Sequence, residues 1–281
     1  SDLLDLADAL GVPSVVFVPA PLVWQARQWG VRRPGWSHWA ETTGEARPLR
    51  RAALVACGTD AVAEQVERLG VASARIVVTP TGVEPAPPPE PGARAATRAR
   101  LGLGDAFTVG WVGSFRRFHA LDLAVEAMVR VPGAVLLLVG DGPERSRVEA
   151  LARTRGVNVV ATGTVPHDDL PTVLAAMDAA VVVAPAGRTF HYSPLKLAEY
   201  FAAGLAVVAP AIGEPGARIR SGEEAVLVPP GDPGAVADAL VRLRDDPDLR
   251  ARLGDRARIA AAAAWSWDRS AERVVTADRK S

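Results

Sequence analysis

Short apolar runs rich in β-branched residues recur along the whole chain, and longer segments with helical spacing of apolar residues separate them. Runs without polar alternation are typical of parallel strands whose sheet is covered on both faces. Strand and helix in regular alternation predict a doubly wound α/β fold. The expected strands occupy residues 14–18, 54–57, 75–79, 107–112, 134–139, 158–161, 179–183, 206–209 and 225–228.

A proline-rich segment at residues 85–92, PAPPPEPG, interrupts this alternation. Proline fixes φ and lacks the backbone donor, so the segment is predicted to be a linker. It separates a partial Rossmann-like domain at residues 1–84 from a complete one at residues 93–265. Residues 266–281 are expected to form a helix that packs back toward the first domain. We therefore predict two Rossmann-like domains, the first incomplete and the second a complete doubly wound parallel sheet.

Composition excludes several classes of protein. The 281 residues carry 32 basic and 32 acidic side chains, and this balance argues against a nucleic-acid partner. The single cysteine, Cys57, excludes an intramolecular disulfide and favours a reducing compartment. No apolar run approaches the ~20 residues of a membrane-spanning helix. The four histidines lack the spacing of metal ligands. We expect a cytoplasmic protein without a metal or a cofactor.

The segment FHYSPLKLAEYFAAG at residues 190–204 carries the clearest functional signal. Ser193 is placed as an N-cap and Pro194 as the first helical residue. The helix follows a strand, so the free N–H groups of Leu195 and Lys196 would lie at the carboxyl edge of the sheet and suit a phosphate. Glu199, one turn further on, can accept hydrogen bonds from ribose hydroxyls. The alternative is an ordinary capped helix with a surface glutamate.

Three more loops, at residues 113–119, 140–143 and 163–167, follow strands at the same edge of the sheet. Arginine side chains in the first of them suit a diphosphate because of their fixed fork of donors, although a solvated basic loop is the alternative. Loops from several strands at one edge indicate a nucleotide at the carboxyl ends of the strands. The candidate donor-binding residues in these loops are Gly113, Ser114, Arg116, Arg117, His119, Asp141, Gly142, Thr164 and Val165.

Five segments together resemble the retaining glycosyltransferases of family 4, which have the GT-B fold of two facing Rossmann-like domains. The resemblance extends from about residue 53 to the carboxyl terminus, and more loosely over residues 11–51. The segments are TPTGV at 79–83, GWVGSF at 110–115, VGDGPE at 139–144, residues 190–204, and LVPPGDP at 227–233.

This resemblance implies that the second domain binds a nucleoside-diphosphate sugar. The diphosphate would lie at the backbone of Leu195 and Lys196, the ribose at Glu199, and the base at Thr164 and Val165. The sugar would be transferred with retention of configuration, and without a metal ion, to an alcohol, glycan or lipid-linked acceptor.

The chain departs from the family pattern at several positions. His191 stands where the family has the first of two glutamates, and Ser114 and His119 replace a basic pair for which Arg116 or Arg117 would substitute. In the first domain, the segment PAP at 19–21 replaces a histidine and Gln25 replaces a glutamate. Because proline has no side-chain donor or acceptor, no catalytic residue is assigned.

The first domain begins midway through the expected pattern of strands. The chain is therefore interpreted as a fragment, as a subunit completed by another polypeptide, or as a degenerate relative. An incomplete sheet leaves an exposed strand edge, so we expect the first domain to associate with a second copy or another chain.

Tryptophan and arginine alternate near the start of the chain. This pattern suits peripheral contact with the inner face of a membrane, or an acceptor surface, and the alternative is packing in the core of the first domain. The residues are Trp24, Arg27, Trp29, Arg32, Arg33, Trp36 and Trp39.

The leading functional hypothesis is an active hexosyltransferase. The second is a catalytically silent relative that binds a nucleotide sugar or a partner chain. A sugar-nucleotide epimerase of the same fold is a weaker third, because such enzymes lack the SPLKL segment.

Overall fold

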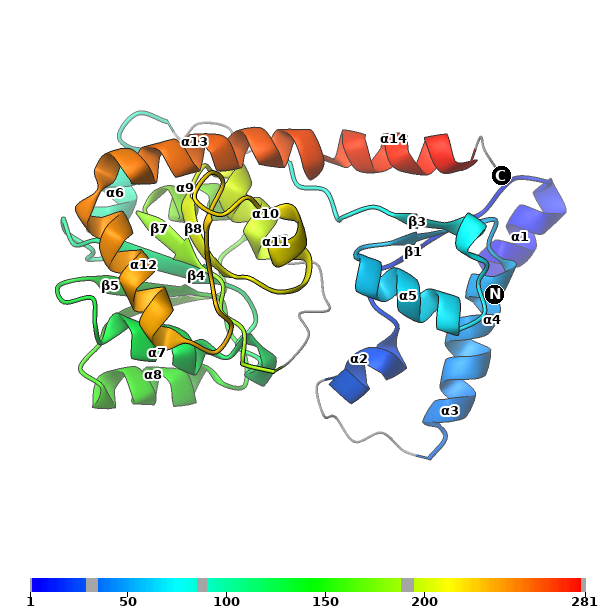
Figure 1. Ribbon diagram of the computed structural model, residues 1–281, viewed down its shortest axis with the longest axis horizontal. Coiled ribbons are helices and arrows are strands. Elements are labelled where there is room, and N and C mark those ends of the chain that lie inside the picture. Colours follow the sequence, from blue (N-terminus) through cyan, green and yellow to red (C-terminus); the bar gives the residue numbers. More distant parts are fainter. Residues whose placement is uncertain (1, 29–34, 85–89, 188–194, 279–281) are drawn as a thin grey trace. The chain divides into compact units, whose positions relative to one another are not determined.

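The computed structural model describes residues 2–28, 35–84, 90–187 and 195–278. The described chain divides into two compact units (Figure 1). The first contains the residues up to Gly82 and those from Trp265 onward, and the second contains the residues from Val83 to Ala264.

The second unit is built on a parallel sheet of six strands in the order β6-β5-β4-β7-β8-β9. Counted within the unit, this order is 3-2-1-4-5-6, which is the strand order of the Rossmann fold, with the change of direction between β4 and β7. The prediction of a doubly wound parallel sheet is confirmed. The strands are β4 (Thr108–Val112), β5 (Val135–Val139), β6 (Asn158–Gly163), β7 (Ala179–Val181), β8 (Ala206–Pro210) and β9 (Val226–Val228).

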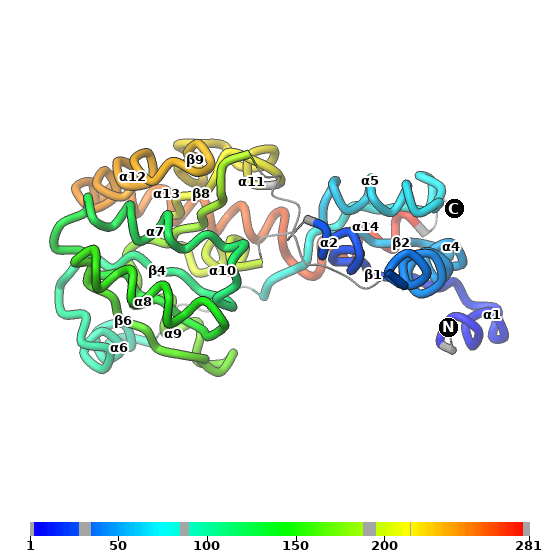
Figure 2. The backbone as a smooth tube through the Cα atoms, turned by 90° about the horizontal axis from the view of Figure 1, so that it is seen from below, coloured from blue at the N-terminus to red at the C-terminus, as the bar shows by residue number. Residues whose placement is uncertain are grey.

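Helices cover both faces of this sheet. One face packs against α7 (Leu121–Met128), α8 (Arg145–Thr154) and α12 (Pro233–Asp245). The other carries α6 (Ala93–Arg100), α9 (Leu170–Ala175), α10 (Leu195–Ala202) and α13 (Pro247–Ala264), as Figure 1 shows. In Figure 2, α7 and α8 lie in front of the sheet and α13 lies behind it. The short α11 (Gly213–Arg218) follows β8.

The central strands have the burial that their sequence predicts. Every residue of β5, VLLLV, is buried, so both faces of the strand are covered. Leu136, Leu137 and Leu138 are completely inaccessible to solvent, and a fully buried leucine stabilises the fold by about 1.5–3 kcal/mol. The continuous apolar run is thus explained by helices on both sides of the sheet.

The first unit is a smaller parallel sheet of three strands in the order β1-β2-β3. The buried side chains of Val55 and Cys57 on β2 pack with α4 and α5 in one apolar core. The strands are β1 (Val15–Val18), β2 (Leu54–Cys57) and β3 (Ile76–Val78). The helices are α1 (Asp2–Leu10), α2 (Leu22–Gln28), α3 (Ser37–Trp39), the π-helical Ala40–Ala46, α4 (Arg47–Arg51), α5 (Asp60–Arg68) and α14 (Trp267–Asp278).

The last helix, α14, packs on the sheet of the first unit, against β2 and β3 (Figure 1). The Ser270 hydroxyl donates a hydrogen bond to the Pro80 carbonyl at 2.8 Å. A Cβ at Gly82 would lie 2.6 Å from Trp267, so glycine is needed for this close approach. The chain therefore returns to the first unit after completing the second.

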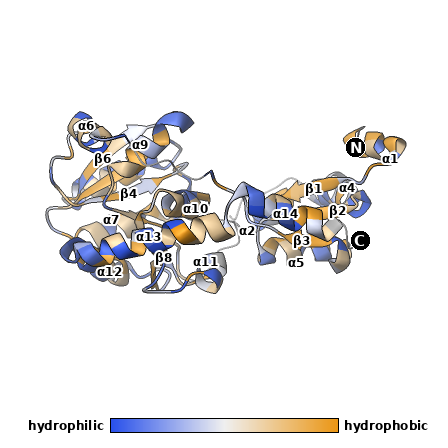
Figure 3. Cartoon of the chain, turned by 90° about the horizontal axis from the view of Figure 1, so that it is seen from above, coloured by the Kyte–Doolittle hydropathy of each residue, from blue (hydrophilic) through white to orange (hydrophobic). Residues whose placement is uncertain are grey.

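Strand β1 has one apolar face that is partly open to solvent. Val15 and Phe17 are 46% and 44% exposed, whereas Val16 and Val18 pack against the core. The preceding helix α1 is largely hydrophobic in Figure 3 and exposes Leu3, Leu6 and Leu10. Among the described residues, no helix combines the length and apolar character needed to cross a membrane.

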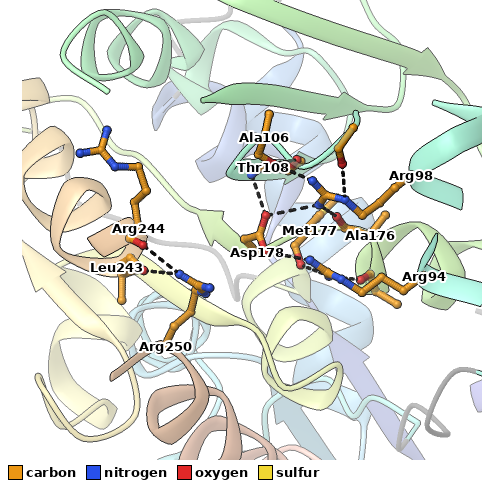
Figure 4. A network of polar contacts seen from close by, with 12 residues as sticks. Arg94, Arg98, Ala106, Thr108, Ala176, Met177, Asp178, Leu243, Arg244 and Arg250 are labelled. Carbon is orange, nitrogen blue, oxygen red and sulfur yellow. Dashed lines mark hydrogen bonds and ion pairs between the residues drawn. The ribbon is translucent and has the colours of Figure 1, made fainter. Parts of the chain in front are cut away.

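An arginine–aspartate network anchors α6 at the amino edge of the larger sheet (Figure 4). Asp178 accepts from Arg94 at 2.8 Å, from Arg98 at 3.3 Å and from the backbone N–H of Thr108 at 2.8 Å. Arg98 also donates to the Ala176 carbonyl at the end of α9. A cavity of about 630 Å³ lies beside this network, at the edge opposite the loops that the sequence selects.

Candidate functional site

Loops that follow β4, β5 and β6 interlock through their backbones at the carboxyl edge of the second sheet. The N–H of Phe115 in the loop after β4 donates to the carbonyl of Asp141 in the loop after β5 at 3.1 Å, and the N–H of Gly140 donates to the carbonyl of Gly163, the last residue of β6, at 2.8 Å. Parallel strands end at the same edge of their sheet, so the loops that follow them also lie at that edge. The three loops thus form one continuous surface.

Glycine is required where these loops touch. Gly140 has φ +116°, and a Cβ there would lie 2.1 Å from the Gly113 carbonyl oxygen. A Cβ at Gly142 would lie 2.7 Å from the Phe115 nitrogen. Neither distance is compatible with a side chain, so the sequence GDG brings the two loops into backbone contact.

Helix α10 begins at Leu195 and is fixed to the end of β4. The backbone N–H of Val112 donates to the Tyr200 hydroxyl at 2.7 Å, and burial raises the pKa of Tyr200. Leu197 and Phe201 are buried beside it. The first turn of α10 is therefore held close to the loop that starts at Gly113. Three predicted site residues, His191, Ser193 and Pro194, lie outside the described residues.

The side chain of Lys196 points to the loop that follows β4. Its Nζ lies 3.3 Å from Nδ1 of His119 and 4.3 Å from the centre of the Trp111 ring. The two nitrogens are thus within hydrogen-bonding distance of each other. Burial lowers the pKa of Lys196 to about 7. Burial, together with the charge of Lys196, lowers the pKa of His119 to about 3.

Aromatic rings surround His119. Trp111 meets it edge to face with ring centres 5.3 Å apart, and Phe118 lies at 4.3 Å. His119 is only 8% exposed. The next residue, Ala120, has φ +49°, a left-handed conformation that L-residues other than glycine seldom adopt. The loop is therefore held in place by close packing on both sides of His119.

Glu199 lies one turn beyond Lys196 on α10 and is half-buried. Burial raises the pKa of this carboxyl, and the charges of His167 and Lys196 oppose the rise. His167 follows β6 and is exposed. Glu199 is thus within electrostatic reach of the loop after β6 as well as of Lys196.

The remaining predicted residues lie around this cluster. The loop after β4 exposes Ser114, Arg116 and Arg117 to solvent. In the loop after β6, Thr164 is exposed and Val165 is half-buried. In the second loop, the Asp141 side chain accepts from the N–H of Gly142 at 2.7 Å. Within the described parts of the chain, no group of histidine, cysteine, aspartate and glutamate side chains is placed to hold a metal ion.

The structure adds Arg145, which sequence reasoning missed. Its guanidinium lies 3.6 Å from Asp141 and 2.7 Å from Glu149, and it would lie 3.3 Å from a Cβ at Gly163. It thus borders the loops after β5 and β6. The only local signal was its place in the first turn of a helix after a glycine turn.

A family model described as glycosyl transferases group 1 matches residues 106–246. The chain belongs to this family. The match begins just before β4 and ends just after α12, so it covers the sheet and the candidate site of the second unit.

Curated relatives of this chain include the D-inositol 3-phosphate glycosyltransferases of Mycobacterium tuberculosis and Mycobacterium bovis. They are 33% identical to it over 252 residues, which cover 85% of this chain and 51% of theirs. The chain thus spans about half the length of these relatives.

Solved structures confirm the GT-B fold. HepE of Anabaena, in complex with UDP and glucose, superposes with a TM-score of 0.76 at 19% identity, covering 99% of this chain and 72% of HepE. Sucrose-phosphate synthase of Thermosynechococcus elongatus has a TM-score of 0.75 at 25% identity, covering 95% of this chain and 67% of that enzyme.

Proposed function

We propose that this member of the group 1 family binds a nucleoside-diphosphate sugar at the carboxyl edge of its second sheet. In this proposal it transfers the sugar to an alcohol acceptor with retention of configuration and without a metal ion. The observation that carries the proposal is the placement of Lys196 and Glu199 on successive turns of α10, with Lys196 against the loop that starts at Gly113.

The chemistry of the site suits each part of such a donor. The first backbone N–H groups of α10 and its dipole favour the diphosphate, and the nearby ammonium of Lys196 adds positive charge. Positive charge fixed at this place stabilises the diphosphate as it leaves the sugar. Glu199 is assigned to the ribose, and the loop at Thr164 and Val165 to the base. UDP in the HepE structure makes a uridine nucleotide the first donor to test.

The acceptor is proposed to be an alcohol, a glycan or a lipid-linked group. The inositol phosphate named for the mycobacterial relatives is the first of these to test. In the first unit, the turn after β1 leads to α2, whose first N–H, that of Leu22, donates to Glu45 at 2.6 Å. This carboxylate neutralises the positive end of α2, so we assign no acceptor phosphate there.

A silent relative is the second candidate function. It is favoured by the prolines Pro19 and Pro21 directly after β1, because neither side chain can transfer a proton. In that case the second unit still binds a nucleotide sugar, and the protein acts as a donor-binding or partner subunit.

One experiment separates these functions. UDP-glucose, GDP-mannose and ADP-glucose are titrated into the protein by calorimetry, and the best binder is then incubated with inositol 3-phosphate, simple alcohols and glycans. Release of nucleoside diphosphate with formation of a glycoside that keeps the anomeric configuration supports the enzyme. Binding without turnover supports the silent relative, and absence of binding to all three contradicts both.

We also propose that the first unit associates with another chain or with a membrane surface at the cytoplasmic face. The supporting observations are the half-open apolar face of β1 and two exposed tryptophans, Trp36 at 58% and Trp39 at 65%. Trp24, by contrast, packs against the core. A monomer in light scattering at micromolar concentration would contradict the first association. Failure to float with anionic vesicles would contradict the second.

A further inference from the structure

We propose that the Lys196 side chain is the cation that positions the donor diphosphate, and that it takes up one proton when the diphosphate binds. This inference rests on the proposed function, because it assumes a nucleotide at the same edge of the sheet. It differs from a role for the backbone of α10 alone, since it assigns both charge and proton exchange to one amine.

The composition of the chain makes this lysine unusual. Of the 32 lysine and arginine residues, only Lys196 and Lys280 are lysines. Arginine serves at every other cationic position of the second unit. Arginine keeps its charge at all accessible pH values, whereas a buried lysine readily changes its protonation. A lysine at position 196 therefore provides a property that the arginines of this chain lack.

The surroundings of Nζ fix its position. Nδ1 of His119 lies 3.3 Å from Nζ, and the centre of the Trp111 ring lies 4.3 Å from it. On a third side is Gly113, where a Cβ would approach Nζ to 3.0 Å. An ammonium has three donors, and the structure records no other hydrogen bond or ion pair of Nζ with a described residue. The amine is thus held at the loop surface with capacity for another acceptor.

The charged groups near Lys196 allow a bound ligand to change the protonation state of its amine. His119 stays neutral, because its pKa is about 3, and burial keeps Tyr200 in its neutral form. Glu199 favours the ammonium but is itself near His167. The net result is a pKa of about 7 for Lys196, so the amine is mostly uncharged at pH 8.

Binding of a diphosphate diester next to this amine favours its charged form. Above pH 7 the site then takes one proton from solvent for each nucleotide bound. Affinity should fall by up to tenfold per pH unit above pH 7, until the pKa of the complex is reached. Below pH 7 the amine already carries the proton, and affinity should be nearly independent of pH.

The test is calorimetry at pH 8 in HEPES and in Tris, which differ in ionisation enthalpy. UDP-glucose is used first, then GDP-mannose or ADP-glucose if either binds more tightly; their diphosphate diesters do not titrate near this pH. The wild type should take up close to one proton per nucleotide. Lys196→Met should take up none and bind at least tenfold more weakly. Lys196→Arg should bind without proton uptake, because arginine is already charged.

Nucleotide binding without proton uptake by the wild type, or with uptake retained in Lys196→Met, overturns this inference and leaves the proposed function intact. Failure of all three nucleotide sugars to bind overturns both.

A second measurement needs no ligand. Competitive acetylation across pH compares Lys196 with Lys280 in the same chain. The reactivity of Lys196 should titrate with a midpoint near pH 7, well below the value of about 10.4 for an unperturbed lysine, and Lys280 is the internal reference. Equal midpoints for the two lysines would overturn the inference whether or not Lys196→Met folds.

Discussion

The carbonyl oxygen of Gly113 lies 2.1 Å from the place where a Cβ on Gly140 would be. The loops after β4 and β5 therefore meet through their backbones, without any intervening side chain. The same loop after β4 carries His119, to which Lys196 is hydrogen-bonded. The contact between the two glycines is thus part of what sets the geometry of the candidate site.

Substitution of Gly140 by alanine should destabilise the second unit by about 2–4 kcal/mol. The left-handed backbone costs a non-glycine residue about 1–2 kcal/mol, and the clash with Gly113 adds a similar amount. Urea denaturation measures this. Gly133→Ala is the matched control, because Gly133 also has positive φ, +76°, but nothing lies near its added Cβ. Equal losses for the two variants would contradict the role of the contact.

Removal of the Asp178 carboxylate should lower the free energy of unfolding by about 3 kcal/mol, because it leaves two arginines without their carboxylate partner and the N–H of Thr108 without its acceptor. The network is at the opposite edge of the sheet, so the nucleotide affinity of Asp178→Ala should stay within twofold of wild type. Asp238→Ala, at an exposed ion pair of 3.5 Å with Arg130, should cost less than about 1 kcal/mol. A comparable loss in both variants would contradict the assignment.

The stability of the second unit should decrease on acidification because of His119. Its pKa is about 3 in the folded state, against about 6.5 when unfolded, so protonation favours the unfolded chain between these values. The contribution of His119 to the free energy of unfolding is complete above pH 6.5. It is lost as the pH falls below this value, by up to about 1.4 kcal/mol per pH unit.

Urea denaturation at pH 7 and pH 5 checks this expectation. The free energy of unfolding of His119→Asn should change much less between these pH values than that of the wild type. For the control His38→Asn, at an exposed residue of the first unit, it should change as much as in the wild type. An unchanged pH dependence in His119→Asn would show that this histidine is not buried as a neutral base.

Much of the fold was predictable because strands covered on both faces contain few polar residues. The run VLLLV of β5 is a clear case, since every one of its side chains is buried. The carboxyl edge was equally accessible to sequence reasoning, because glycine turns and the start of α10 are local patterns. The burial of each tryptophan was harder to predict. Their spacing did not show that Trp24 packs in the core while Trp36 and Trp39 are exposed.

The side-chain contacts of the site were not predictable from local patterns. Lys196 reaches His119, which is 77 positions away in the sequence, and Arg98 reaches Asp178, which is 80 positions away. The sequence predicted a backbone role for Lys196, but only the fold brings its amine to the loop after β4. Arg116 and Arg117, expected near the diphosphate, lie exposed, and their role stays a prediction.

The most direct test of the donor site is the affinity of the best-binding nucleotide sugar for wild type and for Glu199→Ala, measured by calorimetry at pH 7. Loss of the ribose hydrogen bonds to a half-buried carboxylate should weaken binding by about 1–3 kcal/mol. Glu223→Ala, at a carboxylate that is 59% exposed and pairs with Arg220, is the control and should bind as the wild type does. An affinity of Glu199→Ala equal to that of the wild type would contradict the site.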